Sequence, residues 1–139
     1  MKFLSVDRVR TRNGVENFLR DAADRAGLRR IGLRALRRTA ALVAAPSSVR
    51  DWPMVMDVEG RWYLCPDPAG LLISPADEIA STPVDARPEE ADVALAIERV
   101  NAACDLGIRS VRQSWAGLRT FTSDRLPAVG PDPDESSFV

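Results

Sequence analysis

The chain of 139 residues contains no histidine and a single lysine, Lys2. The absence of histidine removes the side chain that most often serves as a general base and as a metal ligand. The two cysteines, Cys65 and Cys104, lack the C-x-x-C spacing of zinc and thioredoxin-type sites, so we expect two reduced, buried thiols. A disulfide between them would require export, and the sequence shows no signal peptide. We therefore expect a cytoplasmic protein without a metal site.

The chain also lacks a charge imbalance and a long apolar run. Nineteen basic and 20 acidic residues give a formal net charge of −1, which provides no general attraction to nucleic acid or anionic lipid. The longest apolar run, residues 40–46, is too short to span a bilayer. We therefore expect neither a nucleic-acid partner nor a membrane span.

Hydrophobic periodicity and turn residues predict the elements of the first half of the chain. A helix is expected over residues 14–26, and a strand over residues 36–45. A meander of three short strands is expected over residues 53–74. Its turns are predicted at residues 59–60 and 66–70, where glycine, proline and aspartate gather.

The second half begins with a loop over residues 75–87. A helix then follows, with Pro88 at its first position and its end near Gly107. Its apolar stripe comprises Val93, Ile97, Val100 and Cys104. A long strand is expected over residues 108–122. This order predicts an α+β fold, with a mixed, mainly antiparallel sheet and helices packed on one face.

Arg119 is the first candidate site residue. On a strand, it shares one face with Trp115, Gly117 and Phe121, because side chains alternate. Guanidinium holds a carboxylate by two parallel hydrogen bonds, and glycine lets a ligand approach the backbone. This face would suit the carboxylate end of an amino acid. From the spacing alone, however, the favoured interpretation is that Arg119 pairs at the surface with a carboxylate such as Asp124. The surrounding Gly-Leu-Arg and Asp-Arg-x-Pro motifs shift the interpretation toward a carboxylate site.

Tyr63 is the only tyrosine. It follows Trp62 on the same predicted strand, so the two side chains point to opposite faces. Its hydroxyl either faces a substrate or lies at the rim of a half-buried ring, which is the commoner arrangement. The two carboxylate pairs, Asp77-Glu78 and Glu89-Glu90, are interpreted as loop and helix-start charges.

A basic cluster is formed by Arg29, Arg30, Arg34, Arg37 and Arg38. No aromatic residues interleave with it, so nucleic-acid binding is disfavoured. A solvated edge, or a contact with a negatively charged cofactor or neighbouring domain, is favoured instead.

Five segments in order resemble the FAD-dependent amine oxidoreductases of the glycine oxidase and D-amino-acid oxidase family. They are residues 26–39, Trp62-Tyr63-Leu64-Cys65-Pro66, Leu72-Ile73-Ser74, Gly117-Leu118-Arg119 and Asp124-Arg125-Leu126-Pro127-Ala128-Val129-Gly130. Together they delimit a substrate-binding-like domain over residues 26–130. A leader with the first helix, residues 1–25, and a loose acidic tail, residues 131–139, flank it.

This resemblance implies that Arg119 binds the substrate carboxylate. It also implies that Tyr63 lines the substrate pocket, and it assigns no catalytic residue. Gly117 and Trp115, which share the strand face of Arg119, are expected to bind the substrate as well. The flavin would accept a hydride from the Cα–H of glycine, a D-amino acid or a related amine. The chain lacks the G-x-G-x-x-G fingerprint of a dinucleotide-binding unit. We therefore expect that it does not bind FAD alone and is inactive without an FAD-binding partner chain.

Two other functions stay open at this point. One is a non-catalytic module that binds small carboxylates, and the other is an interaction module that self-associates through exposed apolar surface. The chain is then a truncated gene product, a split subunit or an independent module. The sequence does not decide among these three or name the substrate.

Overall fold

The computed structural model describes residues 34–82, 84–126 and 130. The helix expected over residues 14–26 and the tail over residues 131–139 lie outside this part of the chain. The chain divides into two units. The first comprises Met1–Leu36, Ala80–Asp85 and Leu118–Val139, and the second comprises Arg37–Ile79 and Ala86–Gly117.

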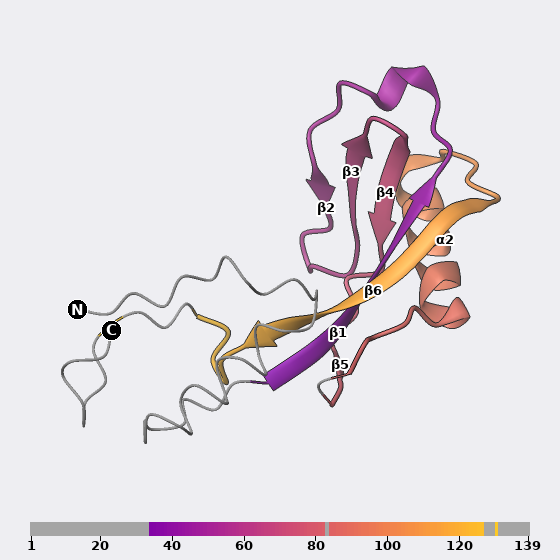
Figure 1. Ribbon diagram of the computed structural model, residues 1–139. Coiled ribbons are helices and arrows are strands. Elements are labelled where there is room, and N and C mark those ends of the chain that lie inside the picture. Colours follow the sequence, from indigo (N-terminus) through magenta and orange to yellow (C-terminus); the bar gives the residue numbers. More distant parts are fainter. Residues whose placement is uncertain (1–33, 83, 127–129, 131–139) are drawn as a thin grey trace. The chain divides into compact units, whose positions relative to one another are not determined.

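The described residues form one six-stranded sheet, in the order β2-β3-β4-β1-β5 with β6 also paired to β1 (Figure 1). The strands are β1 (Arg34–Val43), β2 (Val55–Met56), β3 (Tyr63–Asp67), β4 (Gly70–Ser74), β5 (Ile79–Ala80) and β6 (Val111–Phe121). The pairs β1–β4, β2–β3 and β3–β4 are antiparallel. A short 3-10 helix, η1 (Ser47–Val49), follows β1. The predicted α+β fold is confirmed, and β5 is a strand within the segment predicted as loop.

The predicted meander is present, with a tighter second turn than expected. β3 extends to Asp67 and β4 begins at Gly70, whereas the sequence predicted a turn from residue 66 to residue 70. Asp67 Oδ1 accepts a hydrogen bond of 2.8 Å from the Ala69 backbone N–H. Gly70 has a φ of +151°, a conformation that L side chains rarely adopt. Together these features let the ladder continue almost to the tip of the hairpin.

The helix α2 (Glu90–Cys104) begins two residues later than the predicted start at Pro88. Glu89 is its N-cap, and the first turn is acidic, as the helix dipole favours. Its C-cap is Asp105, which adopts the left-handed conformation with a φ of 47°. The helix therefore ends before Gly107. No helix among the described residues is long and apolar enough to cross a membrane.

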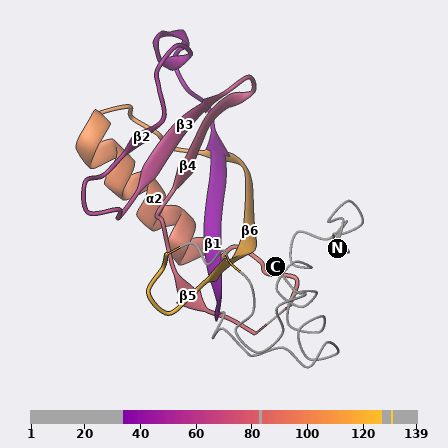
Figure 2. The ribbon, with the colours of Figure 1, turned by 90° about the vertical axis from the view of Figure 1, so that its left-hand side faces the viewer.

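The core of the second unit lies between α2 and one face of the sheet (Figure 2). Its buried members are Ala41, Val43, Val49, Leu64, Leu71, Ile73, Ala96, Val100 and Ile108. The predicted apolar stripe of α2 is confirmed only in part. The buried residues of the helix are Asp92, Ala96 and Val100, of which only Val100 belongs to the predicted stripe. The other stripe residues, Val93, Ile97 and Cys104, are half-buried against the core. An aspartate therefore lies on the buried face of the helix.

Both cysteines are free thiols, as predicted, but each is half-buried rather than fully enclosed. Cys65 alternates along β3 with Leu64, which is completely buried. Since successive side chains of a strand point to opposite faces, Cys65 lies on the face that the core does not cover. Cys104 ends α2 and packs against the margin of the core.

Candidate functional site

The predicted carboxylate-binding strand is β6, and Arg119 lies near its end. The side chain of Arg119 is exposed, while Trp115, Gly117 and Phe121 are half-buried. Ala116, which has the opposite parity, is buried. Trp115 and Gly117 belong to the second unit, and Arg119 and Phe121 belong to the first. The alternation of side chains expected along this strand is thus present in β6.

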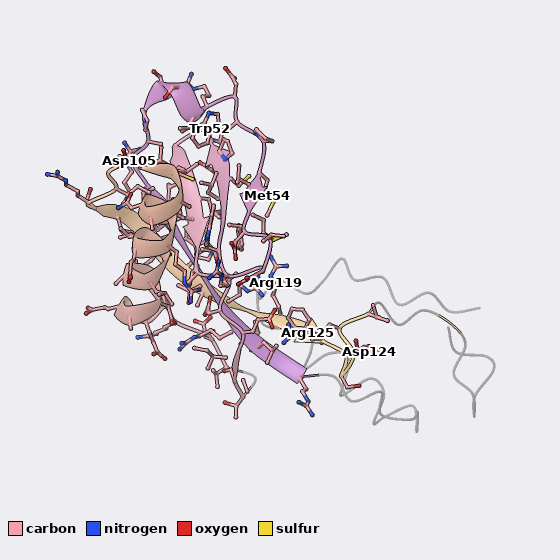
Figure 3. All side chains as sticks on the ribbon, turned by 180° about the vertical axis from the view of Figure 1, so that it is seen from behind. Trp52, Met54, Asp105, Arg119, Asp124 and Arg125 are labelled. Carbon is pink, nitrogen blue, oxygen red and sulfur yellow. The ribbon has the colours of Figure 1, made fainter. Side chains whose placement is uncertain are left out.

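The structure does not form the ion pair between Arg119 and Asp124 that the spacing favoured. Instead, Asp124 Oδ1 accepts a hydrogen bond of 3.1 Å from the Leu126 backbone N–H and lies 2.9 Å from the Thr122 hydroxyl. No described residue forms a hydrogen bond or an ion pair with the side chain of Arg119. Figure 3 shows Arg119, Asp124 and Arg125, which all belong to the first unit. The guanidinium of Arg119 is therefore open to an external anion among these residues.

A local turn explains why Asp124 is not available to Arg119. The Thr122 hydroxyl lies 2.8 Å from the Leu126 carbonyl oxygen, so it can donate either to that oxygen or to Asp124. The Arg125 backbone N–H donates to the Thr122 carbonyl oxygen at 3.2 Å, with Arg125 in the left-handed region at a φ of 64°. The Arg125 guanidinium lies 5.8 Å from the centre of the Phe121 ring, a cation–π distance. Hydrogen bonds within residues 121–126 thus provide the partners of the Asp124 carboxylate.

These hydrogen bonds lower the pKa of Asp124 below its ordinary value of 3.8, first through the Leu126 N–H and then through Thr122. Because the folded-state pKa is lowered, this contribution to stability is present above pH 3.8 and is lost as the pH falls through the folded-state value. We expect Thr122→Val to raise the pKa of Asp124, as measured by an NMR titration of the carboxyl carbon. Thr120→Val is the matched control. An unchanged midpoint in Thr122→Val would show that the hydroxyl donates to the Leu126 carbonyl instead.

Tyr63 begins β3, in the second unit, and its side chain is half-buried. It lies opposite Met56 in β2 and Ser74 in β4. Trp62 packs against the core, so the alternation places Tyr63 on the other face. None of the described residues forms a hydrogen bond with the Tyr63 hydroxyl. Both interpretations of this tyrosine, the substrate-facing hydroxyl and the rim hydroxyl, are compatible with this position.

The largest departure from the sequence interpretation is a charged cluster around Arg37. The sequence favours either a solvated edge or a contact with a negatively charged cofactor or neighbouring domain, but only 9% of Arg37 is exposed. Its Nη2 donates to Asp92 Oδ2 at 2.7 Å, and its Nη1 donates to Glu89 Oε1. Its buried Nε lies 3.9 Å from Asp77 Oδ2 without a hydrogen-bond partner. The hydrogen bond with Glu89, followed by the charge of Asp92, raises the pKa of Arg37 above its ordinary value.

The neighbouring residues complete this cluster. The Thr39 backbone N–H donates to Asp77 Oδ1 at 2.6 Å, and the Thr39 hydroxyl lies 3.0 Å from Asp77 Oδ2. Arg38 donates to the Asp77 carbonyl oxygen at 2.8 Å and to Glu78 at 2.9 Å. Asp77 and Glu78 lie in the loop before β5, and Glu89 and Glu90 lie at the start of α2, as the sequence predicted. Asp77, Glu78 and Glu89 also bind residues of β1. Arg34 is exposed, and Arg29 and Arg30 lie outside the described residues.

One signal in the sequence could have revealed this cluster. Asp92 precedes Ala96 and Val100 at intervals of four residues, which places an acid on the apolar face of the helix. A carboxylate at such a position requires a charged partner. The partner could not be chosen from the sequence, because 55 residues separate Arg37 from Asp92.

Comparisons with known proteins bear on the family and the fold. The family described as FAD dependent oxidoreductase (DAO) matches residues 14–139. Glycine oxidase from Geobacillus kaustophilus is structurally similar with a TM-score of 0.60 at 24% identity, over 81% of this chain and 30% of that protein. Glycine oxidase from Bacillus cereus is similar with a TM-score of 0.53 at 18% identity, over 75% of this chain and 28% of that protein. At such identities these two likenesses establish the fold.

Proposed function

Because the chain belongs to the FAD-dependent oxidoreductase family, we propose that it provides the substrate-binding part of an amine oxidoreductase. The substrates would be glycine, D-amino acids or related amines, whose CH–NH bond is oxidised. The chain spans less than a third of each glycine oxidase to which it is similar. The proposed role is accordingly limited to recognition of the substrate carboxylate.

The observation that carries this proposal is the state of Arg119. It is exposed on β6, and its nearest acidic residue in sequence, Asp124, is occupied by a local turn. A guanidinium without a carboxylate partner is well suited to bind one from a ligand. At Gly117, an added Cβ would meet no atom of the described residues within 4 Å, so the backbone there is open to approach. Tyr63, Gly117 and Trp115 are proposed as further substrate-binding residues.

The described residues do not fit the pyrophosphate of FAD. A dinucleotide is normally held at the N-terminus of a helix that follows a glycine-rich turn. The N-terminus of α2, by contrast, carries Glu89, Glu90 and Asp92, which would repel a phosphate. We therefore propose that an FAD-binding partner chain supplies the oxidation.

Loss of Arg119 should abolish most of the affinity for a small amino acid. We expect Arg119→Ala to weaken binding of glycine or D-alanine by about 10- to 100-fold, since a hydrogen bond to a charged group contributes about 1.5–3 kcal/mol. Arg119→Lys should retain part of the affinity, because it keeps the charge but loses the bidentate geometry. Isothermal titration calorimetry measures all of these affinities.

Arg109→Ala is the matched control, because Arg109 is also exposed and has no partner among the described residues. Equal affinity of the wild-type protein and Arg119→Ala would refute the proposed carboxylate site. Binding that depends on Arg119, without oxidation when an FAD-binding chain is supplied, would support the alternative of a non-catalytic carboxylate-binding module.

A further inference from the structure

Three sulfur-containing side chains lie on one face of the sheet in the second unit. Met56 of β2 pairs with Tyr63 of β3, and residues directly opposite each other on neighbouring strands share a face. Side chains alternate along an extended chain, so Met54 shares the face of Met56, and Cys65 shares the face of Tyr63. Met54, Met56 and Cys65 therefore form a sulfur cluster on the face that the core does not cover.

The register of the two strands brings the members of the sulfur cluster close together. Met54 lies in the segment that leads into β2, as Figure 3 shows, and the antiparallel register places it opposite Cys65. Directly opposed Cβ atoms are about 4.5–5.5 Å apart, and diagonal neighbours such as Met56 and Cys65 are about 7–8 Å apart. Methionine has three rotatable bonds, so both thioether sulfurs can reach the thiol of Cys65 across these separations.

The sulfur cluster is accessible from solvent. Met54 and Met56 are 55% and 61% exposed, and Cys65 is a half-buried free thiol. Within the described residues, this thiol makes one weak hydrogen bond, of 3.6 Å, to the Pro66 carbonyl oxygen. An ion can therefore approach all three sulfurs, and the thiol gives up little when it binds one.

We propose that Met54, Met56 and Cys65 bind one copper(I) ion. Thioether and thiolate sulfurs are soft donors, and soft donors select Cu(I). Zinc instead takes four ligands, mostly from cysteine, histidine and acidic residues, and the described residues contain no group of three or more of these that could hold a metal. The sequence predicts no metal site because it lacks histidine and C-x-x-C spacing, but neither criterion counts thioether sulfur.

Binding of Cu(I) exchanges a proton for the metal ion. A thiol binds metals as the thiolate, so the Sγ–H bond of Cys65 breaks, an Sγ–Cu bond forms and one proton is released. Both thioethers donate a lone pair and lose no group, and copper keeps its oxidation state. The thiolate and Cu(I) charges cancel, which suits a half-buried position. This site does not depend on carboxylate binding, because Arg119 belongs to the first unit.

An anaerobic titration of the reduced chain with Cu(I), in competition with the chelator bicinchoninate, tests the site. We expect one Cu(I) ion per chain, with only sulfur neighbours in X-ray absorption spectra. Cys65→Ser and the double variant Met54→Leu, Met56→Leu should each weaken binding by at least about tenfold, since even residues that only support a metal ligand contribute about 10- to 100-fold. Leucine nearly conserves the volume of methionine, so the double variant should remain folded.

Cys104→Ala is the matched control, because Cys104 is also a half-buried free thiol but ends α2, outside the sulfur cluster. Its affinity for Cu(I) should equal that of the wild-type chain, and circular dichroism verifies that every variant is folded. A wild-type chain that loses Cu(I) to the chelator would overturn the proposal. Equal losses in the two cysteine variants would do the same, since any thiol would then suffice. Wild-type affinity in the double methionine variant would show that the thioethers take no part, which also overturns it.

Discussion

Arg37→Ala should lower the free energy of unfolding by about 3 kcal/mol, the lower end of the range for breaking a buried ion pair. The guanidinium is the positive partner of Asp92 and also contacts Asp77, and both acids are largely shielded from water. Its removal would leave these carboxylates without a compensating charge. The expected loss lies at the lower end because Glu89, the other partner, is 63% exposed and can be solvated in its place.

Urea unfolding followed by circular dichroism measures this loss. Arg109→Ala, at an exposed site without a described partner, is the control and should change stability by less than about 0.5 kcal/mol. The double variant Arg37→Met, Asp92→Leu removes both charges and should recover part of the stability lost in Arg37→Ala. A loss below about 1 kcal/mol in Arg37→Ala would contradict the view that this ion pair stabilises the fold.

Gly70→Ala should destabilise the protein by at least about 2 kcal/mol, since backbone strain and steric overlap each cost about 1–3 kcal/mol. The φ of +151° is unfavourable for alanine, and the added Cβ would overlap the carbonyl oxygen of Val43 in β1. This oxygen belongs to the backbone of a completely buried residue and cannot move aside easily. The β3–β4 turn therefore requires glycine for two independent reasons.

Gly60→Ala separates these two reasons. Gly60 has a φ of +69°, but an added Cβ would meet no described atom within 4 Å. We expect a cost of about 1 kcal/mol there, from the left-handed conformation alone. The same thermal or urea unfolding experiment compares both variants. Equal losses at the two glycines would show that the overlap with Val43 relaxes without cost.

The elements that the sequence predicted correctly are those specified by local signals. The β2–β4 meander follows from alternating apolar residues and from turns rich in glycine and proline, and β6 lies within the strand expected over residues 108–122. Boundaries were less accurate: α2 ends at Cys104, followed by Asp105 as a left-handed C-cap, instead of near Gly107. Asn101 side-chain hydrogen bonds of 2.8 and 2.9 Å to the backbone of Ile108 fix this end, and no propensity rule anticipates them.

The candidate site shows the same limit. The parity of β6 predicted which residues share a face with Arg119, because alternation is a local property. The interpretation of Asp124 as its partner was wrong, because hydrogen bonds within residues 122–126 compete for that carboxylate. The partners of Arg37 could not be predicted, because they come from the segment after β4 and from α2. Long-range electrostatic partners require the tertiary structure.

The charged cluster has a consequence for the order in which the chain folds. The hydrogen bonds of Arg37 join it to residues 52 and 55 positions away, whereas the β3–β4 hairpin closes across a turn of two residues. Short loops close at a smaller cost in entropy, so the hairpin can form before β1 and α2 meet. The ion pair between Arg37 and Asp92 would then form late in folding, after most of the apolar surface is buried. A cluster that forms after the rate-limiting step slows unfolding and leaves the folding rate nearly unchanged. The ion pair between Arg37 and Asp92 at the start of α2 is thus expected to slow unfolding of the sheet without being needed for its assembly.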